Sequence, residues 1–218
     1  MNVSKIVITG GPCAGKSTAL ERVKSEFSKM GYEVLFVAET ATELISGGVT
    51  PWTCASSEEF QRCVLQLQVE KERIFEKAAK TMRAEKVLIV CDRGALDGKA
   101  YMTEAEFSSA LDLVGSNEVA LRDQYGAVFH LVSVAKGAAE FYTTNNNSAR
   151  TETLSEAAAL DEKMISAWSG HPHFRVIGNC GTFEEKMKCL MAEIAAFLGE
   201  PEPCKFDGKV LIKPQGHD

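Results

Sequence analysis

The stretch of the chain that decides its fold is Gly10-Gly11-Pro12-Cys13-Ala14-Gly15-Lys16-Ser17. It matches the pattern G-x-x-x-x-G-K-[ST] in full, and it lies between an apolar run, 5–9, and a helical pattern that ends near Gly31. The glycines let backbone N–H groups turn inward around phosphate oxygens, and the N-terminus of the following helix adds its positive dipole. The stretch therefore predicts a site for the phosphates of a nucleotide, with a plain glycine-rich turn as the alternative.

Two side chains of this loop carry the chemistry of a nucleoside triphosphate site. Lys16 supplies a point charge for the β and γ phosphates, and the hydroxyl of Ser17 is a ligand for Mg²⁺. We therefore expect ATP or GTP with Mg²⁺ as the cofactors. The residues expected to contact the nucleotide in and after the loop are Gly11, Pro12, Cys13, Ala14, Gly15, Lys16, Ser17 and Thr18.

Outward from the loop, strand-like runs alternate with helical patterns, which is typical of a parallel α/β domain. The strand-like runs are 5–9, 33–38, 86–91, 127–133 and 174–177. The run 86–91 is the most continuously apolar and reads as a central buried strand. One domain over 1–199 and a C-terminal tail over 200–218 are expected, because the tail holds three of the six prolines and only one short apolar run.

Composition narrows the class of protein. The 218 residues are 45% hydrophobic and 25% charged, which is enough for a full core, and the net charge of −6 argues against sequence-independent nucleic-acid binding. No apolar run approaches the roughly 18 residues of a membrane helix, and the N-terminus lacks a signal-peptide pattern. Seven cysteines without a Cys-x-x-Cys pair favour free thiols in a reducing compartment. We expect a cytoplasmic protein with no nucleic-acid partner and no membrane segment.

Charged residues follow the second and third of these strands. Ligands of an open parallel sheet bind outside the carboxyl ends of its strands, where Glu39 and Asp92-Arg93 lie. Glu39 is a candidate general base, Asp92 a candidate carboxylate linked to Mg²⁺, and Arg93 a candidate for holding the substrate. The alternatives are helix capping by Glu39 and Asp92, and an ion pair between Arg93 and a neighbouring carboxylate.

A polar segment, 141–150, lies between the fourth strand and the next helical pattern. In a phosphotransferase, a mobile lid at this place brings an arginine over the transferring phosphate, and Arg150 is the candidate. The alternative is an ordinary asparagine-rich loop.

The motifs taken together resemble a known family. The segments that carry the resemblance are 8–18, 38–45, 91–101, 141–153 and 167–174. They are similar to the AAA-type ATP/GTP-binding domain of the TRPL translocation defect protein family, and the resemblance covers about residues 4–199. That family is in turn similar to the nicotinamide riboside kinase module of NadR and, more distantly, to deoxyribonucleoside kinases.

The resemblance implies a three-layer P-loop NTPase fold of the kinase-like kind. Its five-stranded parallel sheet would have the order 2-3-1-4-5, with helices on both faces. By similarity to the nucleoside kinases, Glu39 matches a base and Asp92-Arg93 an Asp-Arg pair. Further matches are Gln61 and Gln66, near where those enzymes read the acceptor, Arg150 as a lid arginine, and Asn179 near the nucleotide base.

Two functions follow as hypotheses. The first is Mg²⁺-dependent phosphoryl transfer from ATP to a small hydroxylated acceptor, with catalytic roles for Lys16, Glu39, Asp92, Arg93 and Arg150. The second is a nucleotide-dependent regulatory switch or slow NTPase in trafficking or signalling, with a protein partner and no small-molecule acceptor. Metabolite kinases usually carry several lid arginines, whereas Arg150 is the only basic residue between Lys136 and Lys163, which favours the switch. The charged residues at the strand ends favour the kinase.

Overall fold

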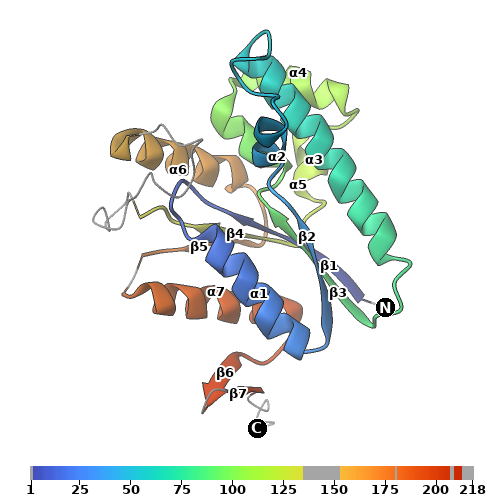
Figure 1. Ribbon diagram of the computed structural model, residues 1–218, viewed down its shortest axis with the longest axis vertical. Coiled ribbons are helices and arrows are strands. Elements are labelled where there is room, and N and C mark those ends of the chain that lie inside the picture. Colours follow the sequence, from blue (N-terminus) through green and yellow to red (C-terminus); the bar gives the residue numbers. More distant parts are fainter. Residues whose placement is uncertain (1, 135–152, 180, 207–208, 213–218) are drawn as a thin grey trace.

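A computed structural model describes residues 2–134, 153–179, 181–206 and 209–212 of the chain (Figure 1). Its main feature is a five-stranded parallel sheet in the order β2-β3-β1-β4-β5, which confirms the expected fold class and strand order. The strands are β1 (Asn2–Thr9), β2 (Tyr32–Val37), β3 (Lys86–Asp92), β4 (Ala127–Leu131) and β5 (Phe174–Ile177). Because β1 is central, the loop that follows it emerges in the middle of the carboxyl edge of the sheet.

Helices cover both faces of this sheet, as expected from its apolar strands (Figure 1). One face packs against α1 (Lys16–Lys29) and α7 (Phe183–Leu198). The other packs against α3 (Ser57–Ala79), α4 (Glu104–Leu113), α5 (Glu118–Arg122) and α6 (Leu154–Trp168). The central strands are buried on both sides, and Ile6, Val7 and Ile8 of β1 have no exposed surface.

Capping patterns in the sequence define the starts of three helices. The side chains of Ser56, Thr153 and Thr182 each accept a hydrogen bond from the backbone N–H three residues on, at the starts of α3, α6 and α7. At the last two positions the glutamate at the third residue also bonds back to the cap, which completes a capping box.

The elements differ from expectation in three places. The sequence predicts a helical region over about 103–123, but the structure has two helices there, α4 and α5, because Gly115 between them adopts a left-handed φ of 60°. A 3-10 helix, η1 (Ala95–Tyr101), follows β3, and a short helix, α2 (Thr40–Ser46), follows β2. The tail contains β6 (Pro203–Phe206) and β7 (Lys209–Ile212), which pair with each other as a separate antiparallel sheet.

In the described part of the chain, every helix is too short or too polar to span a bilayer.

Candidate functional site

The phosphate loop joins β1 directly to the first turn of α1. Gly15, the residue before the helix, has a left-handed φ of 93° and caps it without a side-chain hydrogen bond. A Cβ at Gly10 would lie 2.3 Å from the carbonyl oxygen of Leu131, so that position admits only glycine. Since no side chain caps α1, the first N–H groups of the helix are open to an anion.

Lys16 presents its ammonium group to a cavity beside the loop. In the described residues its Nζ has no hydrogen bond or ion pair, in contrast to most buried cations. Burial, together with the positive charge of Arg93, lowers the pKa of Lys16, while Glu39, Asp92 and Asp97 oppose that shift. A phosphate would supply the partner that this cation lacks.

Asp92 ends β3, close enough to Lys16 for the two charges to interact. Within the described residues its Oδ1 is buried and has no hydrogen-bond partner. Burial raises the pKa of Asp92, and the charge of Lys16 opposes this. Asp92 does not cap the next helix, because Gly94 starts η1 and its N–H donates instead to Asp97 Oδ2 (2.7 Å).

Glu39 and Arg93 form an ion pair at the mouth of the cavity. Arg93 Nε lies 2.5 Å from Glu39 Oε1, which confirms the ion-pair alternative for Arg93. Burial alone would raise the pKa of Glu39, but the charges of Arg93 and Lys16 and a hydrogen bond from Thr42 lower it to about 2. Glu39 precedes α2 without a side-chain capping bond, so the capping alternative is wrong for this residue.

The backbone of Arg93 shows that its position is held under strain. Arg93 has a φ of 70°, in the left-handed region that non-glycine residues rarely adopt. Its backbone carbonyl accepts a hydrogen bond from Gln68 Nε2 (3.2 Å). Strained residues of this kind concentrate at functional sites, which agrees with the place of Arg93 in the lining of the cavity.

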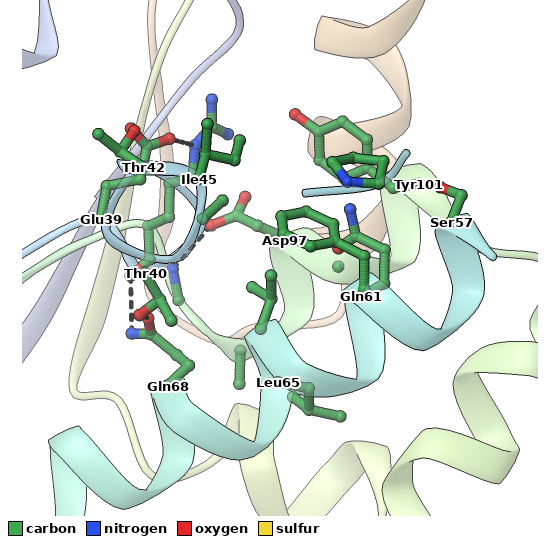
Figure 2. Close-up of a pocket in the computed structure, with 18 of the residues that line it drawn as sticks. Glu39, Thr40, Thr42, Ile45, Ser57, Gln61, Leu65, Gln68, Asp97 and Tyr101 are labelled. Carbon is green, nitrogen blue, oxygen red and sulfur yellow. Dashed lines mark hydrogen bonds and ion pairs between the residues drawn. The ribbon is translucent and has the colours of Figure 1, made fainter. Parts of the chain in front are cut away.

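The cavity has a volume of about 310 Å³ and is bounded by the phosphate loop, α2, α3 and η1. The charged groups of its lining include Lys16, Glu39 and Arg93, and Figure 2 shows Glu39 and Thr40 on one side with Gln61 and Tyr101 on the other. The lining also includes three aromatic side chains, Trp52, Phe60 and Tyr101. Phe60 is buried, whereas Trp52 at the rim is 74% exposed.

The two glutamines expected near the acceptor have different positions on α3. Gln61 is buried, lines the cavity and makes no hydrogen bond to a described residue. Gln66 is exposed and does not line the cavity. Gln68 lines it instead, because residues 61, 65 and 68 share one face of the helix. The amide of Gln68 accepts a hydrogen bond from Thr40 and donates one to Glu72.

Of the two remaining expected residues, the structure describes only Asn179. Asn179 lies just past β5, where its Nδ2 donates to the carbonyl of Ser133 (2.8 Å) and its Oδ1 accepts from Lys186 (2.8 Å). The segment 141–150, with Arg150, lies outside the described residues.

Sequence reasoning missed a polar cluster behind the loop, formed by Ser133, Asp161 and Lys186. All three side chains are buried, and each bonds to a backbone group of the phosphate loop. The available signal was weak: Lys186 is a charge beside the apolar stripe of α7 that includes Met187 and Leu190.

The phosphate loop, the ammonium group of Lys16 and the carboxylate of Asp92 agree with the family to which the sequence is similar. A family model described as "AAA domain" matches residues 5–186, which is well over half of the chain. The chain belongs to this AAA domain family. No curated protein matches it. The AAA domain of this chain is thus a P-loop nucleotide-binding domain for a nucleoside triphosphate, and such domains usually bind it with Mg²⁺.

Proposed function

We propose that this AAA domain transfers the γ-phosphoryl group of ATP to a hydroxyl of a small acceptor held in the cavity beside the phosphate loop. The observation that carries the proposal is the cavity itself. Its lining combines Lys16, where the terminal phosphate of a nucleotide would lie, and the Glu39–Arg93 ion pair with three aromatic side chains. A protein that only bound and hydrolysed a nucleotide would have no need for these aromatic side chains beside the phosphate site.

Ser17 and Asp92 are the residues that would hold Mg²⁺. The side chain of Ser17 is exposed in the first turn of α1, and the buried oxygen of Asp92 is without a partner in the described residues, so both fit the ion or its waters. No group of three or more His, Cys, Asp or Glu side chains among the described residues is placed to hold a metal, which agrees with an ion bound largely through phosphates and water. When bound, Mg²⁺ neutralises charge on the phosphates.

Glu39 would orient the acceptor hydroxyl. Its pKa of about 2 makes it an ionised hydrogen-bond acceptor and a weak base at neutral pH. Phosphoryl transfer through a loose transition state needs little proton removal before the bond to the leaving oxygen breaks, so orientation is the larger contribution. Arg93 fixes the carboxylate of Glu39, and Arg150 is proposed to close over the phosphates from the lid segment.

The acceptor would be a hydroxylated molecule with a planar ring. Trp52, Phe60 and Tyr101 offer aromatic surfaces, and the amide of Gln61 offers both a donor and an acceptor to a ring edge. A volume of about 310 Å³ lies at the lower end of the roughly 300–1,000 Å³ usual for small-molecule sites. The resemblance to the TRPL family and the NadR kinase module supports a nucleoside or nicotinamide riboside.

The second candidate function is the nucleotide-dependent switch or slow NTPase. The observation in its favour is that Arg150 is the only basic residue between Lys136 and Lys163. It would bind ATP or GTP, hydrolyse it slowly and present a changed conformation to a protein partner. For either function we propose a cytoplasmic location, because Cys54, Cys63 and Cys91 are free thiols. We also propose no nucleic-acid partner, because the net charge is −6.

The experiment that tests the proposal measures ADP and GDP release from Mg²⁺-ATP and Mg²⁺-GTP, with and without a pool of nucleosides and nicotinamide riboside. Release stimulated by an acceptor and absent in Lys16→Ala supports the kinase. Slow release that no acceptor changes supports the switch. The two nucleotides compared side by side give the base preference.

A matched pair of variants on α3 tests whether the acceptor occupies the cavity. Gln61→Ala should raise the KM for the acceptor about tenfold while leaving the KM for ATP unchanged, since the proposed hydrogen bond between this buried side chain and the acceptor is lost. Gln66→Ala, on the same helix but exposed, should change neither. Equal acceptor KM values for the two variants would place the acceptor elsewhere.

A further inference from the structure

Three buried side chains hold the phosphate loop from the side away from the cavity. They are Lys186 of α7, Ser133 just past β4 and Asp161 of α6, here called the rear bracket. Each comes from a different element, and together they bond to three backbone groups of the loop, at Gly11, Pro12 and Ala14. None of the three lines the cavity, so the acceptor site does not account for them.

Lys186 uses all three of its donors. Its Nζ donates to the carbonyl of Ala14 (3.1 Å) in the loop, to the carbonyl of Val132 (2.6 Å) past β4, and to Oδ1 of Asn179 (2.8 Å) past β5. One ammonium group therefore ties the phosphate loop to two neighbouring strand ends. The segment past β5 that holds Asn179 is fixed by the same contact.

Ser133 and Asp161 hold the preceding turn of the loop. Ser133 Oγ donates to the carbonyl of Pro12 (2.5 Å). Asp161 Oδ1 accepts from the N–H groups of Gly11 (3.0 Å) and Ser133 (3.2 Å) and lies 3.0 Å from Nε2 of His130. Because Gly11 approaches so closely, a Cβ there would lie 2.8 Å from Asp161 Oδ1.

The charge of Lys186 indicates that the rear bracket stabilises the phosphate loop rather than the hydrophobic core. Lys186 is only 4% exposed, and in the described residues no carboxylate lies within ion-pair distance of its Nζ. Burying a cation against carbonyl oxygens alone is costly, and an apolar side chain of equal length would pack on the same stripe of α7 without that cost. What an apolar residue cannot do is hold the Ala14 carbonyl.

We propose that Lys186 is a positioning residue for nucleotide binding, which acts with Ser133 and Asp161 to fix the first half of the phosphate loop. With Gly11, Pro12 and Ala14 held from behind, the N–H groups of the loop's second half are already aimed at the phosphates when the nucleotide arrives. Preorganisation of this kind raises affinity because less ordering remains to be done on binding. The inference concerns nucleotide binding alone and holds whether the domain is a kinase or a switch.

Isothermal titration of Mg²⁺-ADP into Lys186→Met and Lys188→Met tests this inference. Lys188 is exposed on the same helix and is the matched control. The Kd should rise about tenfold or more for Lys186→Met and stay at the wild-type value for Lys188→Met, since the lost hydrogen bonds are charged ones. Thermal unfolding without nucleotide establishes that both variants are folded at the titration temperature. Equal Kd values for two folded variants would overturn the proposal.

The pH dependence of the Kd for Mg²⁺-ADP is a second test. A residue with a purely structural role would not change this dependence. Burial lowers the pKa of Lys186 to about 8, and Asp161 of α6 is the charged side chain that opposes this shift. A neutral amine has two donors for three oxygen acceptors, so affinity of the wild type should weaken as the pH rises through about 8. Lys186→Met should lack that step, and a step of the same size in both proteins would contradict the proposal.

Ser133→Ala tests the role of the rear bracket in nucleotide binding if Lys186→Met fails to fold. This variant removes the hydrogen bond to the Pro12 carbonyl and leaves the backbone contact with Asp161 intact. The expected rise in Kd is about threefold to tenfold. A wild-type Kd for folded Ser133→Ala would then overturn the rear bracket as a positioning device.

Discussion

Lys16 lies in the phosphate loop, and Lys186 of α7 bonds to that loop. Burial lowers the pKa of both lysines, but their hydrogen-bonding surroundings differ. Lys16 faces the cavity and has no hydrogen-bond partner in the described residues, whereas Lys186 spends all three donors on backbone and amide oxygens. A cation without a hydrogen-bond partner in the protein is available to bind a ligand. A cation whose donors are all used within the protein stabilises the structure instead. We therefore expect Lys16 to bind the nucleotide directly, and Lys186 to affect nucleotide binding through the backbone of the loop.

The contrast extends to the carboxylates. On the cavity side, Asp92 Oδ1 is buried without a partner in the described residues. On the other side, Asp161 Oδ1 accepts hydrogen bonds from two backbone N–H groups. Variants on the cavity side should therefore remove chemistry and spare the fold, while variants behind the loop should alter how well the loop is formed.

The largest effect is expected for Lys16→Ala. Turnover should fall by about 10²–10³-fold, since a charge aimed at the transferring phosphate is lost. The unfolding temperature should stay the same or rise, because the variant removes a partly buried cation that has no protein partner in the described residues. Steady-state kinetics and calorimetry check the two halves. A variant that loses activity only because it unfolds would contradict the contrast.

Asp92→Asn should come next. We expect turnover to fall by about 10²-fold and the Mg²⁺ concentration for half-maximal rate to rise, because an amide is a poorer ligand for Mg²⁺ or its waters. Asp112→Asn, on the exposed surface of α4, is the control. A Mg²⁺ titration of the rate measures both variants, and an unchanged Mg²⁺ requirement in Asp92→Asn would exclude this residue from the metal site.

Gly11→Ala tests the rear bracket from the side of the loop. The added Cβ would lie 2.8 Å from Asp161 Oδ1 and 3.2 Å from Ser133 Cβ, so the loop or α6 must shift. We expect a loss of about 1–3 kcal/mol in unfolding free energy and a weaker Kd for Mg²⁺-ADP. Gly47→Ala, whose Cβ would meet nothing closer than 3.4 Å, should be nearly neutral in denaturant titrations. Equal stability of the two variants would show that Gly11 is not closely held.

The smallest effect is a pH dependence of stability. The pKa of Lys186 is about 8 in the folded protein, below its value of 10.5 in the unfolded chain, so the unfolded chain binds more protons between these values. Stability relative to Lys186→Met should therefore rise as the pH increases through that window. Nucleotide affinity should fall over the start of the same window. Denaturant titrations at several pH values measure the first trend, and parallel trends in stability and affinity would contradict the account.

The fold was predictable from local patterns. The loop Gly10–Ser17, the apolar runs and the capping pairs such as Thr182 with Glu185 each act over a few residues, and all agree with the structure. The strand order came from the resemblance and was confirmed. The tail hairpin was missed, although Asp207-Gly208 is a dipeptide favoured in hairpin turns and precedes the apolar run 210–212.

The site was only partly predictable, for a physical reason. Residues that follow strands, such as Glu39 and Asp92, meet at one sheet edge by topology alone, so position in the sequence identified them. The rear bracket depends on which side of α6 and α7 faces the loop, and Asp161 and Lys186 are separated from Gly11 and Ala14 by most of the chain. The glutamines of α3 pose the same difficulty, since helix phase decides that Gln61 and Gln68 line the cavity and Gln66 does not.

A crystal structure with Mg²⁺ and a non-hydrolysable ATP analogue would test the central claim most directly. The account predicts a phosphate oxygen within hydrogen-bond distance of Lys16 Nζ, Mg²⁺ between Ser17 and the side of Asp92, and an open cavity beyond the terminal phosphate. Lys186 Nζ should still donate to the Ala14 carbonyl. A structure in which Lys186 leaves that carbonyl to bind a phosphate, or in which the nucleotide fills the cavity, would contradict it.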